Sequence, residues 1–466
     1  MRTTFLIALT ALALTACRSD DDKDDVDDTA TAGDTDSASD GTTDGTTDGT
    51  TDGTNDSGTS GSTDGSFACG DIAGTDLCDT WWKNTTAETS VNVVDSDGSA
   101  ILVNIRGLQR VSSGGVDYLQ VDTSGIPNYS YTLTAADVAE LEGRPNAASD
   151  FTVGVPDVSA GQVVQFGDDL GFESQSPAGS CGVGEGFGFW PPGPECPYDV
   201  GTLLNIPVSP TEAAAGTECE TGLGITGLWV SGVSIFNWGD GFAYDDDGSW
   251  LNIAGAQEVY DLDICAGHAA NGEYHHHSYS KCLADGLGDA GGGHSPIYGW
   301  AADGYPIHGP WQADGVEAQS CWVQRDYDDA SDPYGCGGTG ERSCQMVDPF
   351  DPSQGTQAAT SWGPTTSETV VSLSGNSFSG ADGLYYQDFY YDADCTTAGG
   401  AALDEHNGHD HDGLGYHYHI THDFPFTMGP TLRGEVDDGV NCGGVSAGGL
   451  GGGGEGGPGG PGGGPP

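Results

Sequence analysis

The 466-residue chain has very few basic residues: 11 Lys and Arg stand against 71 Asp and Glu, which gives a formal net charge of −60. Nucleic acids and anionic membrane surfaces are bound by basic faces, so this charge argues against both as partners. Residues 18–66 hold only 15 acidic and two basic residues, whereas residues 67–446 hold 55 acidic and eight basic residues. Most of the charge therefore belongs to the part that can fold, where it favours cations.

Long hydrophobic runs are also lacking. An apolar run over residues 5–16 is too short to span a bilayer and is typical of a signal-peptide core. It ends in Leu14-Thr15-Ala16-Cys17, which resembles a bacterial lipobox. We therefore expect residues 1–17 to be a lipoprotein signal peptide, Cys17 to carry the lipid, and this lipid to be the chain's membrane contact. Arg18 favours the outer membrane or cell surface; an ordinary signal peptide with a chance cysteine is the alternative.

Cysteine, in contrast, is abundant and even in number once Cys17 is set aside. The other 12 cysteines lie between Cys69 and Cys442. In an exported protein this indicates up to six disulfides, whose connectivity the sequence does not fix. The close pairs that we expect are Cys69/Cys78, Cys181/Cys196, Cys265/Cys282 and Cys336/Cys344.

The composition divides the chain into three parts. Residues 18–66 consist mainly of Asp, Thr, Gly and Ser, and residues 444–466 are rich in Gly and Pro, so we expect a disordered acidic tether and a disordered tail. Between them, short β-branched runs such as residues 91–94, 101–105 and 369–373 are separated by turn residues. The pattern predicts a mainly β, single loop-rich domain stapled by disulfides, with one helix over Ala135–Leu141.

Two pairs of matching blocks indicate an internal duplication. Residues 227–237 and 299–309 each place apolar residues on both sides of a Ser-Gly or Asp-Gly pair, which is a hairpin signal. Downstream of each, a D-x-x-x-G-H block that ends at His268 or His409 precedes a Y-H-x-H block. The latter blocks are Tyr274-His275-His276-His277 and Tyr416-His417-Tyr418-His419. We therefore expect a domain built from two copies of a hairpin plus a Y-H-x-H strand.

These blocks resemble the YHYH-domain family, which is named for the motif at residues 416–419. The resemblance extends over about residues 90–433 and includes Ser124-Gly125-Ile126-Pro127-Asn128. It implies a YHYH-type β domain over residues 67–443, but it implies no activity, because the biochemical function of the family is undetermined. The chain departs from the family pattern at His406, where the family has Cys, and at His308, where it has Tyr. The change at position 406 puts a disulfide in doubt.

Histidine is absent from the first 267 residues, and all 12 histidines lie between His268 and His422. In a strand, residues i and i+2 face the same side, so each Y-H-x-H block presents a same-face histidine pair. Two such pairs on neighbouring strands would bring four imidazoles together, with one further ligand from each half. Neutral imidazoles suit Zn or Cu, and a three-plus-three set is what a dicopper centre needs. The expected metal ligands are His268, His275, His277, His409, His417 and His419.

The same histidines also allow other interpretations. They could pack within strands without metal, in an extracellular binding or adhesion module, or they could capture and store metal without chemistry. If the protein is catalytic, copper-dependent oxidation is the class that we expect, with Tyr274, Tyr416 or Tyr418 close enough to tune the metal. We expect structural or supporting roles for His276, His294 and His308, and solvated loop positions for His406, His411 and His422.

Other chemical signals are weak. Asp95-Ser96-Asp97-Gly98 and Asp245-Asp246-Asp247-Gly248 are as rich in oxygen as calcium loops but lack the distal Glu of an EF-hand, so ordinary acidic turns are favoured over Ca²⁺ sites. No nucleophile elbow, P-loop or H-E-x-x-H motif occurs. Classical hydrolase chemistry therefore has no support in the sequence.

Overall fold

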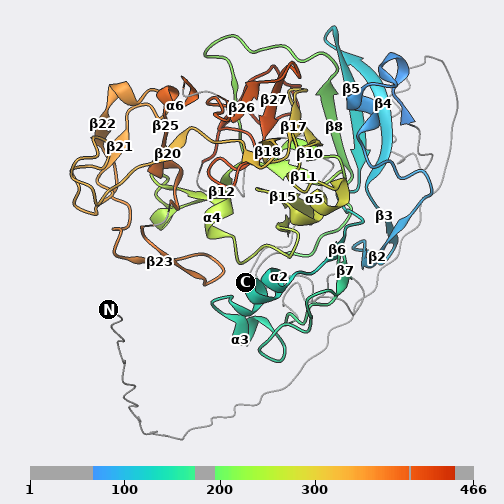
Figure 1. The fold of residues 1–466 in the computed structure, drawn as a ribbon, viewed down its shortest axis with the longest axis horizontal. Coiled ribbons are helices and arrows are strands. Elements are labelled where there is room, and N and C mark those ends of the chain that lie inside the picture. The colour runs from blue at the N-terminus through green and yellow to red at the C-terminus, as the bar shows by residue number, and fades with distance from the viewer. Residues whose placement is uncertain (1–66, 174–190, 192–194, 382, 398–399, 447–466) are drawn as a thin grey trace, which may run out of the picture. The chain divides into compact units, whose positions relative to one another are not determined.

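A computed structural model describes residues 67–173, 191, 195–381, 383–397 and 400–446 (Figure 1). These residues fall in one compact unit and form a mainly β, loop-rich fold stapled by disulfides, as the sequence predicts. Residues 1–66, which include the expected signal peptide, Cys17 and the acidic tether, and most of the Gly/Pro-rich tail lie outside the described residues. Among the described residues, no helix is long and apolar enough to span a bilayer.

An eight-stranded sheet carries both histidine blocks (Figure 1). Its strands, in spatial order, are β14 (Gly267–Ala270), β15 (Glu273–His276), β11 (Ser234–Phe236), β10 (Ile225–Trp229), β16 (Ile297–Ala301), β17 (Pro306–His308), β27 (Tyr416–His419) and β26 (Gly408–Asp410). The two predicted hairpins, β10/β11 and β16/β17, occupy the middle. The two Y-H-x-H strands, β15 and β27, lie one strand in from the two edges.

The duplication is visible in the strand pairing. Strands β10 and β16 meet as antiparallel neighbours, with Leu228 opposite Trp300, and the two halves extend from this seam. In each half the second hairpin strand pairs in parallel with the Y-H-x-H strand, which in turn pairs antiparallel with the D-x-x-x-G-H strand. Ala266 and Asn407, at equivalent positions before β14 and β26, both adopt left-handed backbone, with φ of 64° and 66°. The two halves thus share even local strain.

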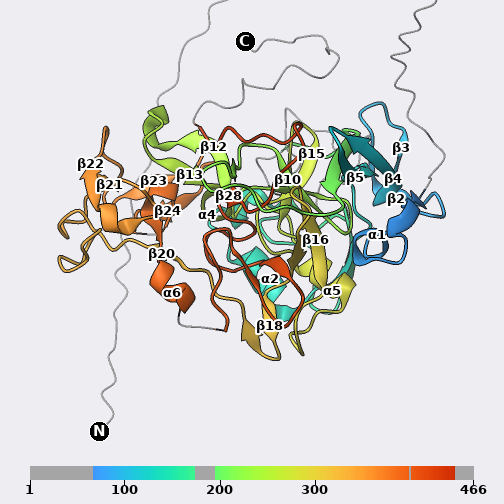
Figure 2. The same ribbon diagram turned by 90° about the horizontal axis from the view of Figure 1, so that it is seen from above.

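A second sheet packs on the same hydrophobic core. Its buried residues Leu119, Val121 and Ile206 belong to one cluster with Leu228 and Trp229 of the larger sheet. Its strands, in spatial order, are β1 (Phe67–Ala68), β4 (Ile105–Ser113), β5 (Val116–Thr123) and β8 (Thr202–Pro207). Figures 1 and 2 show β4 and β5 on one side of the unit and the pairs β20–β25 and β21–β22 on the other.

The other described strands form two-stranded ribbons. They confirm the predicted β run at residues 91–94 and the first three residues of the run predicted at 369–373, whereas the run predicted at 101–105 is divided between β3, which ends at Leu102, and β4, which begins at Ile105. The ribbons are β2 (Thr89–Val94) with β3 (Ala100–Leu102), β6 (Ser130–Thr132) with β7 (Val163–Gln165), β9 (Cys219–Glu220) with β28 (Thr431–Leu432), β12 (Gly239–Ala243) with β13 (Leu251–Ile253), β18 (Trp311–Ala313) with β19 (Val316–Glu317), β20 (Trp322–Gln324) with β25 (Phe389–Tyr391), β21 (Cys344–Met346) with β22 (Thr356–Ala358), and β23 (Thr369–Val371) with β24 (Ser377–Ser379).

The helices are short. The sequence predicts one of the two longest and misses the other. The predicted helix is α2, which begins after a capping box between Thr134 and Asp137. The missed helix is α5, whose N-terminus is capped by the Ser280 hydroxyl and which buries Cys282 and Leu283. The helices are α1 (Asp76–Asp79), α2 (Ala135–Glu142), α3 (Ala147–Asp150), α4 (Ala254–Gln257), α5 (Lys281–Leu287) and α6 (Ala393–Thr397), with 3-10 turns at η1 (Gly70–Ile72), η2 (Tyr244–Asp246), η3 (Pro352–Gln354) and η4 (Tyr386–Asp388).

The disulfides confirm three of the four expected close pairs. Cys69–Cys78, Cys265–Cys282 and Cys336–Cys344 are bonded as expected, and Cys219–Cys442 and Cys321–Cys395 are bonded as well. In the fourth expected pair, Cys196 is disulfide-bonded but Cys181 lies outside the described residues.

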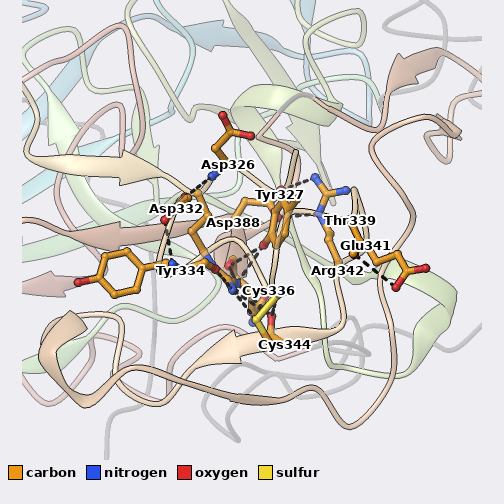
Figure 3. Close-up of a disulfide and its surroundings, with 12 residues drawn as sticks. Asp326, Tyr327, Asp332, Tyr334, Cys336, Thr339, Glu341, Arg342, Cys344 and Asp388 are labelled. Carbon is orange, nitrogen blue, oxygen red and sulfur yellow. Dashed lines mark hydrogen bonds and ion pairs between the residues drawn. A yellow bond between two sulfur atoms is a disulfide. The ribbon is translucent and has the colours of Figure 1, made fainter. Parts of the chain in front are cut away.

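Some of the few basic side chains hold segments of the fold together through buried ion pairs and hydrogen bonds. In the region around the Cys336–Cys344 disulfide, buried Arg342 pairs with Asp388 through Nε and Nη2, at 2.7 and 2.9 Å (Figure 3). The Tyr327 hydroxyl donates to the same carboxylate at 3.0 Å and accepts from the Nη1 of Arg325 at 2.9 Å. Because breaking a buried ion pair leaves an uncompensated charge, this network strongly favours one arrangement of the region.

Candidate metal centres

The first histidine group, here called site A, lies at the β14 edge of the large sheet. His268 on β14 is opposite His275 on β15, and His277 follows that strand on the same side as His275. All three side chains are buried, and their ligand nitrogens lie within 4.8 Å of one another. The sequence predicted these three residues as ligands of the first half.

Hydrogen bonds orient two of these imidazoles with their Nε2 atoms toward each other. His275 Nδ1 donates to the carbonyl of Glu273 at 2.9 Å, and His277 Nδ1 donates to the carbonyl of Asn237 at 2.6 Å. A carbonyl oxygen can only accept, so each Nδ1 carries the proton and each Nε2 presents a lone pair. Burial lowers the pKa of His275 well below its usual value and that of His277 to about 4, so neither ring is cationic at neutral pH.

The two Nε2 atoms nevertheless lie only 3.0 Å apart. Two lone pairs at this distance repel each other, and a cation between them turns the repulsion into coordination. Nitrogen ligands of one Zn or Cu ion, each about 2.0–2.1 Å from the metal, lie about 2.9–3.4 Å apart. The spacing in site A therefore fits two ligands of one metal ion.

A carboxylate that no sequence motif marks lies beside the three histidines of site A. Glu258, directly after α4, places Oε2 3.5 Å from the Nε2 atoms of both His268 and His277. Glu258 Oε2 and His268 Nε2 are buried and have no hydrogen-bond partner among the described residues. Burial, with repulsion from Asp240 and Asp261, raises the pKa of Glu258 well above its usual value. A cation at this point would supply a partner to both atoms.

The second group, here called site B, lies at the opposite edge of the sheet. His417 and His419 on β27 and His294, in the segment before β16, have ligand nitrogens within 4.8 Å of one another. The Nε2 atoms of His294 and His417 are 3.4 Å apart. His409 on β26 is opposite His417, its ring centre lies 4.9 Å from that of His417, and its buried Nε2 has no hydrogen-bond partner among the described residues.

Further imidazoles surround these four. The ring centre of His308, on β17, is 4.8 Å from that of His417 and 4.7 Å from that of His294. His411 lies parallel to His409 at 5.1 Å. Site B is thus rich in imidazole, and Phe236, at the position equivalent to His308, instead stacks on His275 at 3.9 Å in site A.

The backbone orients the imidazoles of site B as it does those of site A. His417 Nδ1 donates to the carbonyl of Gly415 at 2.8 Å, and His419 Nδ1 donates to that of Gly309 at 2.6 Å. Gly415 and Gly309 are the equivalents of Glu273 and Asn237 in the duplication. Both Nδ1 atoms therefore carry the proton, and the Nε2 atoms present lone pairs. The duplication repeats the orientation of the two histidines of each Y-H-x-H block.

The structure corrects the prediction that the two Y-H-x-H pairs meet. Four strands separate β15 from β27, so the pairs lie about 24 Å apart measured along the sheet. A dicopper centre shared between the halves is therefore wrong. The local sequence shows that the two pairs are equivalent, but it does not show that the hairpins pair with each other and carry them to opposite edges.

Several supporting assignments also change. His294, expected in a structural or supporting role, belongs to the histidine group of site B, and His308, expected in the same role, lies beside that group. His406, expected in a solvated loop, is buried with its Nδ1 2.9 Å from the Thr431 hydroxyl. It takes the place of Cys265, so the second half lacks the disulfide of the first. His276 packs in the core on Tyr129, and the ring of His422 is about half exposed.

The motif tyrosines lie on the opposite face of the strands from the ligand histidines. Tyr274 donates to Asp263 at 2.7 Å, Tyr416 donates to Asp404 at 3.0 Å, and Tyr418 donates to Asp303 at 2.6 Å. The expectation that these hydroxyls lie close enough to tune a metal is therefore wrong. Strand alternation directs them instead to the buried carboxylates of Asp263 and Asp303 and to the partly buried carboxylate of Asp404.

The two acidic loops form ordinary turns. Asp97 Oδ1 accepts from the backbone N–H of Ser99 at 2.8 Å in the turn between β2 and β3, and Asp247 Oδ1 accepts from that of Ser249 at 2.8 Å. Neither loop contributes to a group of three or more possible ligands among the described residues. The structure thus gives no support to calcium binding there.

Both sites lie within a segment that matches a known protein family. Residues 203–434 match the family model of the YHYH protein. The chain is a YHYH-domain protein. The YHYH match covers every histidine of both sites, ends beside the expected boundary, and begins at residue 203 rather than near residue 90. No curated protein and no solved structure matches the chain.

Proposed function

We propose that the YHYH domain binds transition-metal ions at two separate mononuclear centres, site A and site B. The observation that supports this most strongly is the convergence of Nε2 lone pairs. His275 and His277 in site A, like His294 and His417 in site B, have Nδ1 held by a backbone carbonyl and bring their Nε2 atoms to 3.0 and 3.4 Å. Packing alone does not favour such close approach.

Zn and Cu are the proposed metals. Imidazole suits both, and neither site contains a thiolate, since the cysteines of the YHYH region described here are disulfide-bonded. The carboxylate of Glu258 is a harder ligand, in the hard–soft sense, than imidazole, so site A is the harder of the two ligand sets. The all-imidazole set of site B favours Cu. The role that we propose is metal capture at the cell envelope, with site A also able to act on a bound ligand.

The test is metal analysis of protein folded under oxidising conditions with Cu, Zn, Fe and Mn supplied together. We expect two metal ions per chain in wild type, one in His275→Ala/His277→Ala and one in His417→Ala/His419→Ala. His422→Ala is the matched control, because this exposed histidine lies outside both groups, and it should keep two. A wild-type protein without bound metal would overturn the proposal in favour of a metal-free binding or adhesion module.

We also propose that a lipid on Cys17 holds the protein at the outside of the cell, in the outer membrane or at the cell surface. The five disulfides among the described residues support an oxidising compartment. The Cys17→Ser variant should leave the membrane fraction while its disulfides still form. Membrane retention of this variant would contradict the anchor.

A further inference from the structure

We propose that a metal in site A keeps a coordination position open to a ligand from outside, whereas a metal in site B is enclosed by imidazoles. The inference rests on the proposed metal binding and adds that the two centres differ in the number of donors that the chain supplies. It assigns the reactive role to site A and the holding role to site B.

Site A lies where two cavities meet. Cavities of about 320 and 680 Å³ share the lining residues Asp240, Glu258 and His268, and the larger one is also lined by His275 and His277. The four donors of site A therefore form part of a cavity wall rather than a closed shell. Cu(II) prefers a tetragonal arrangement with more than four positions, and catalytic Zn keeps one position for water or substrate.

Two other carboxylates near site A already accept hydrogen bonds. Asp240, which lines both cavities, accepts from the backbone N–H of Phe242 at 2.8 Å and from the Asn252 amide at 3.1 Å. Glu273 lines the larger cavity, but its Oε1 accepts from the Ser234 hydroxyl at 2.6 Å. A ligand from the cavity thus has little competition for the open position.

Site B gathers more imidazoles than site A does. His417 and His419 are fully buried, and the ring centres of His294 and His409 lie 5.1 Å from that of His419. His308 adds a fifth imidazole against His417. Five imidazoles around one Cu(II) ion would take up more of its positions than the four donors of site A do.

The cavities also select the kind of ligand. Their walls contain the carboxylates of Glu195, Asp240, Glu258, Asp261 and Glu273, and no Lys or Arg is among the lining residues. Phe236 and Leu223 add an apolar part to the larger cavity. The walls therefore favour a neutral or cationic donor with an apolar body, such as an amine or an azole, and repel anions.

The experiment uses the full chain loaded with Cu(II) and follows the electron paramagnetic resonance spectrum. In the His417→Ala/His419→Ala variant only site A can bind copper, and in the His275→Ala/His277→Ala variant only site B can. If an Ala pair fails to fold, the corresponding Gln pair replaces it. Imidazole, neutral at pH 8, is the probe, and acetate is the anionic control. Bound copper is measured after each addition.

We expect imidazole to change the site A spectrum saturably while copper stays bound, and to leave the site B spectrum unchanged. The affinity of acetate relative to that of imidazole should be about tenfold lower at site A than for Cu(II) free in solution, because the carboxylates of the wall repel acetate. Leu223→Trp should weaken imidazole binding without loss of copper, since Leu223 lines the cavity but is not a ligand.

Two results would overturn the inference while the proposed function stands. One is a site A spectrum that imidazole does not alter, and the other is the same change at both sites. If neither single-site protein binds copper before the probe is added, the proposed function itself fails and the inference falls with it.

Discussion

At the scale of single residues, backbone carbonyls decide what the histidines can do. Each carbonyl that accepts from an Nδ1 fixes the tautomer and turns the Nε2 lone pair toward its neighbours. In site A this leaves Glu258 and His268 with buried atoms that lack a hydrogen-bond partner in the described structure. The histidines of the motif were predictable from period-two spacing, whereas Glu258 was not, because only the tertiary fold brings it to them.

The variant Glu258→Gln tests the carboxylate. The amide removes a negative ligand, so we expect metal affinity at site A to fall by roughly tenfold or more while site B is unchanged. Competition titration with a chelator on the site A protein measures this. Glu195→Gln, which changes an exposed carboxylate of the adjacent cavity, is the control. Equal affinities of Glu258→Gln and wild type would remove Glu258 from the ligand set.

At the scale of elements, local patterns predicted the strands and not their order. Alternation and the Ser-Gly and Asp-Gly turns were enough for β10, β11, β15, β16, β17 and β27. The parallel pairs β11–β15 and β17–β27 join segments separated by long loops, and no local signal specifies which strand they choose. Helix α5 was missed because its seven residues, with a glycine among them, depend on the Ser280 cap and on a disulfide.

That disulfide, Cys265–Cys282, ties α5 to the segment that leads into β14 and His268. Its closed loop predicts a loss of about 3 kcal/mol of unfolding free energy in Cys265→Ser/Cys282→Ser. We also expect weaker metal binding at site A and unchanged binding at site B. Denaturant titration and metal analysis measure the two effects. Cys336→Ser/Cys344→Ser, which opens a disulfide remote from both sequence motifs, should leave site A loaded; equal metal loss in both variants would contradict the coupling.

The contact between α2 and α5 predicts a pH dependence. Asp137 caps α2 and accepts from Lys281 Nζ at 2.6 Å. Burial raises the pKa of Asp137, but the hydrogen bonds from Lys281 and Thr134 outweigh it and hold this pKa below 3.8. The resulting stability is present above pH 3.8 and is lost as the pH falls through the folded-state pKa.

Asp137→Asn should therefore reduce the unfolding free energy by about 1–2 kcal/mol at neutral pH. The difference from wild type should shrink as the pH falls from neutral toward pH 2 and Asp137 becomes protonated in the folded protein as well. Denaturant titrations of the two proteins across this range measure it. A difference that persists unchanged at pH 2 would show that charge is not the cause.

At the scale of the whole molecule, the shortage of basic residues acquires a structural meaning. Seven of the eight Lys and Arg side chains between residues 67 and 446 pair with carboxylates. The eighth, Arg325, donates to backbone carbonyls and to Tyr327. The many remaining carboxylates attract cations over about 8 Å at physiological ionic strength. The charge pattern could be predicted from the sequence, but its concentration around site A could not.

The central claim is that two equivalent halves hold two separate metal ions at opposite edges of one sheet. Pulsed dipolar electron paramagnetic resonance on the Cu(II)-loaded chain tests it most directly. We expect two coppers per chain at a separation of about 15–25 Å, because four strands lie between β15 and β27. The dipolar signal should disappear in either His→Ala double variant. A single copper per chain, or a spectroscopically silent coupled pair, would contradict the account.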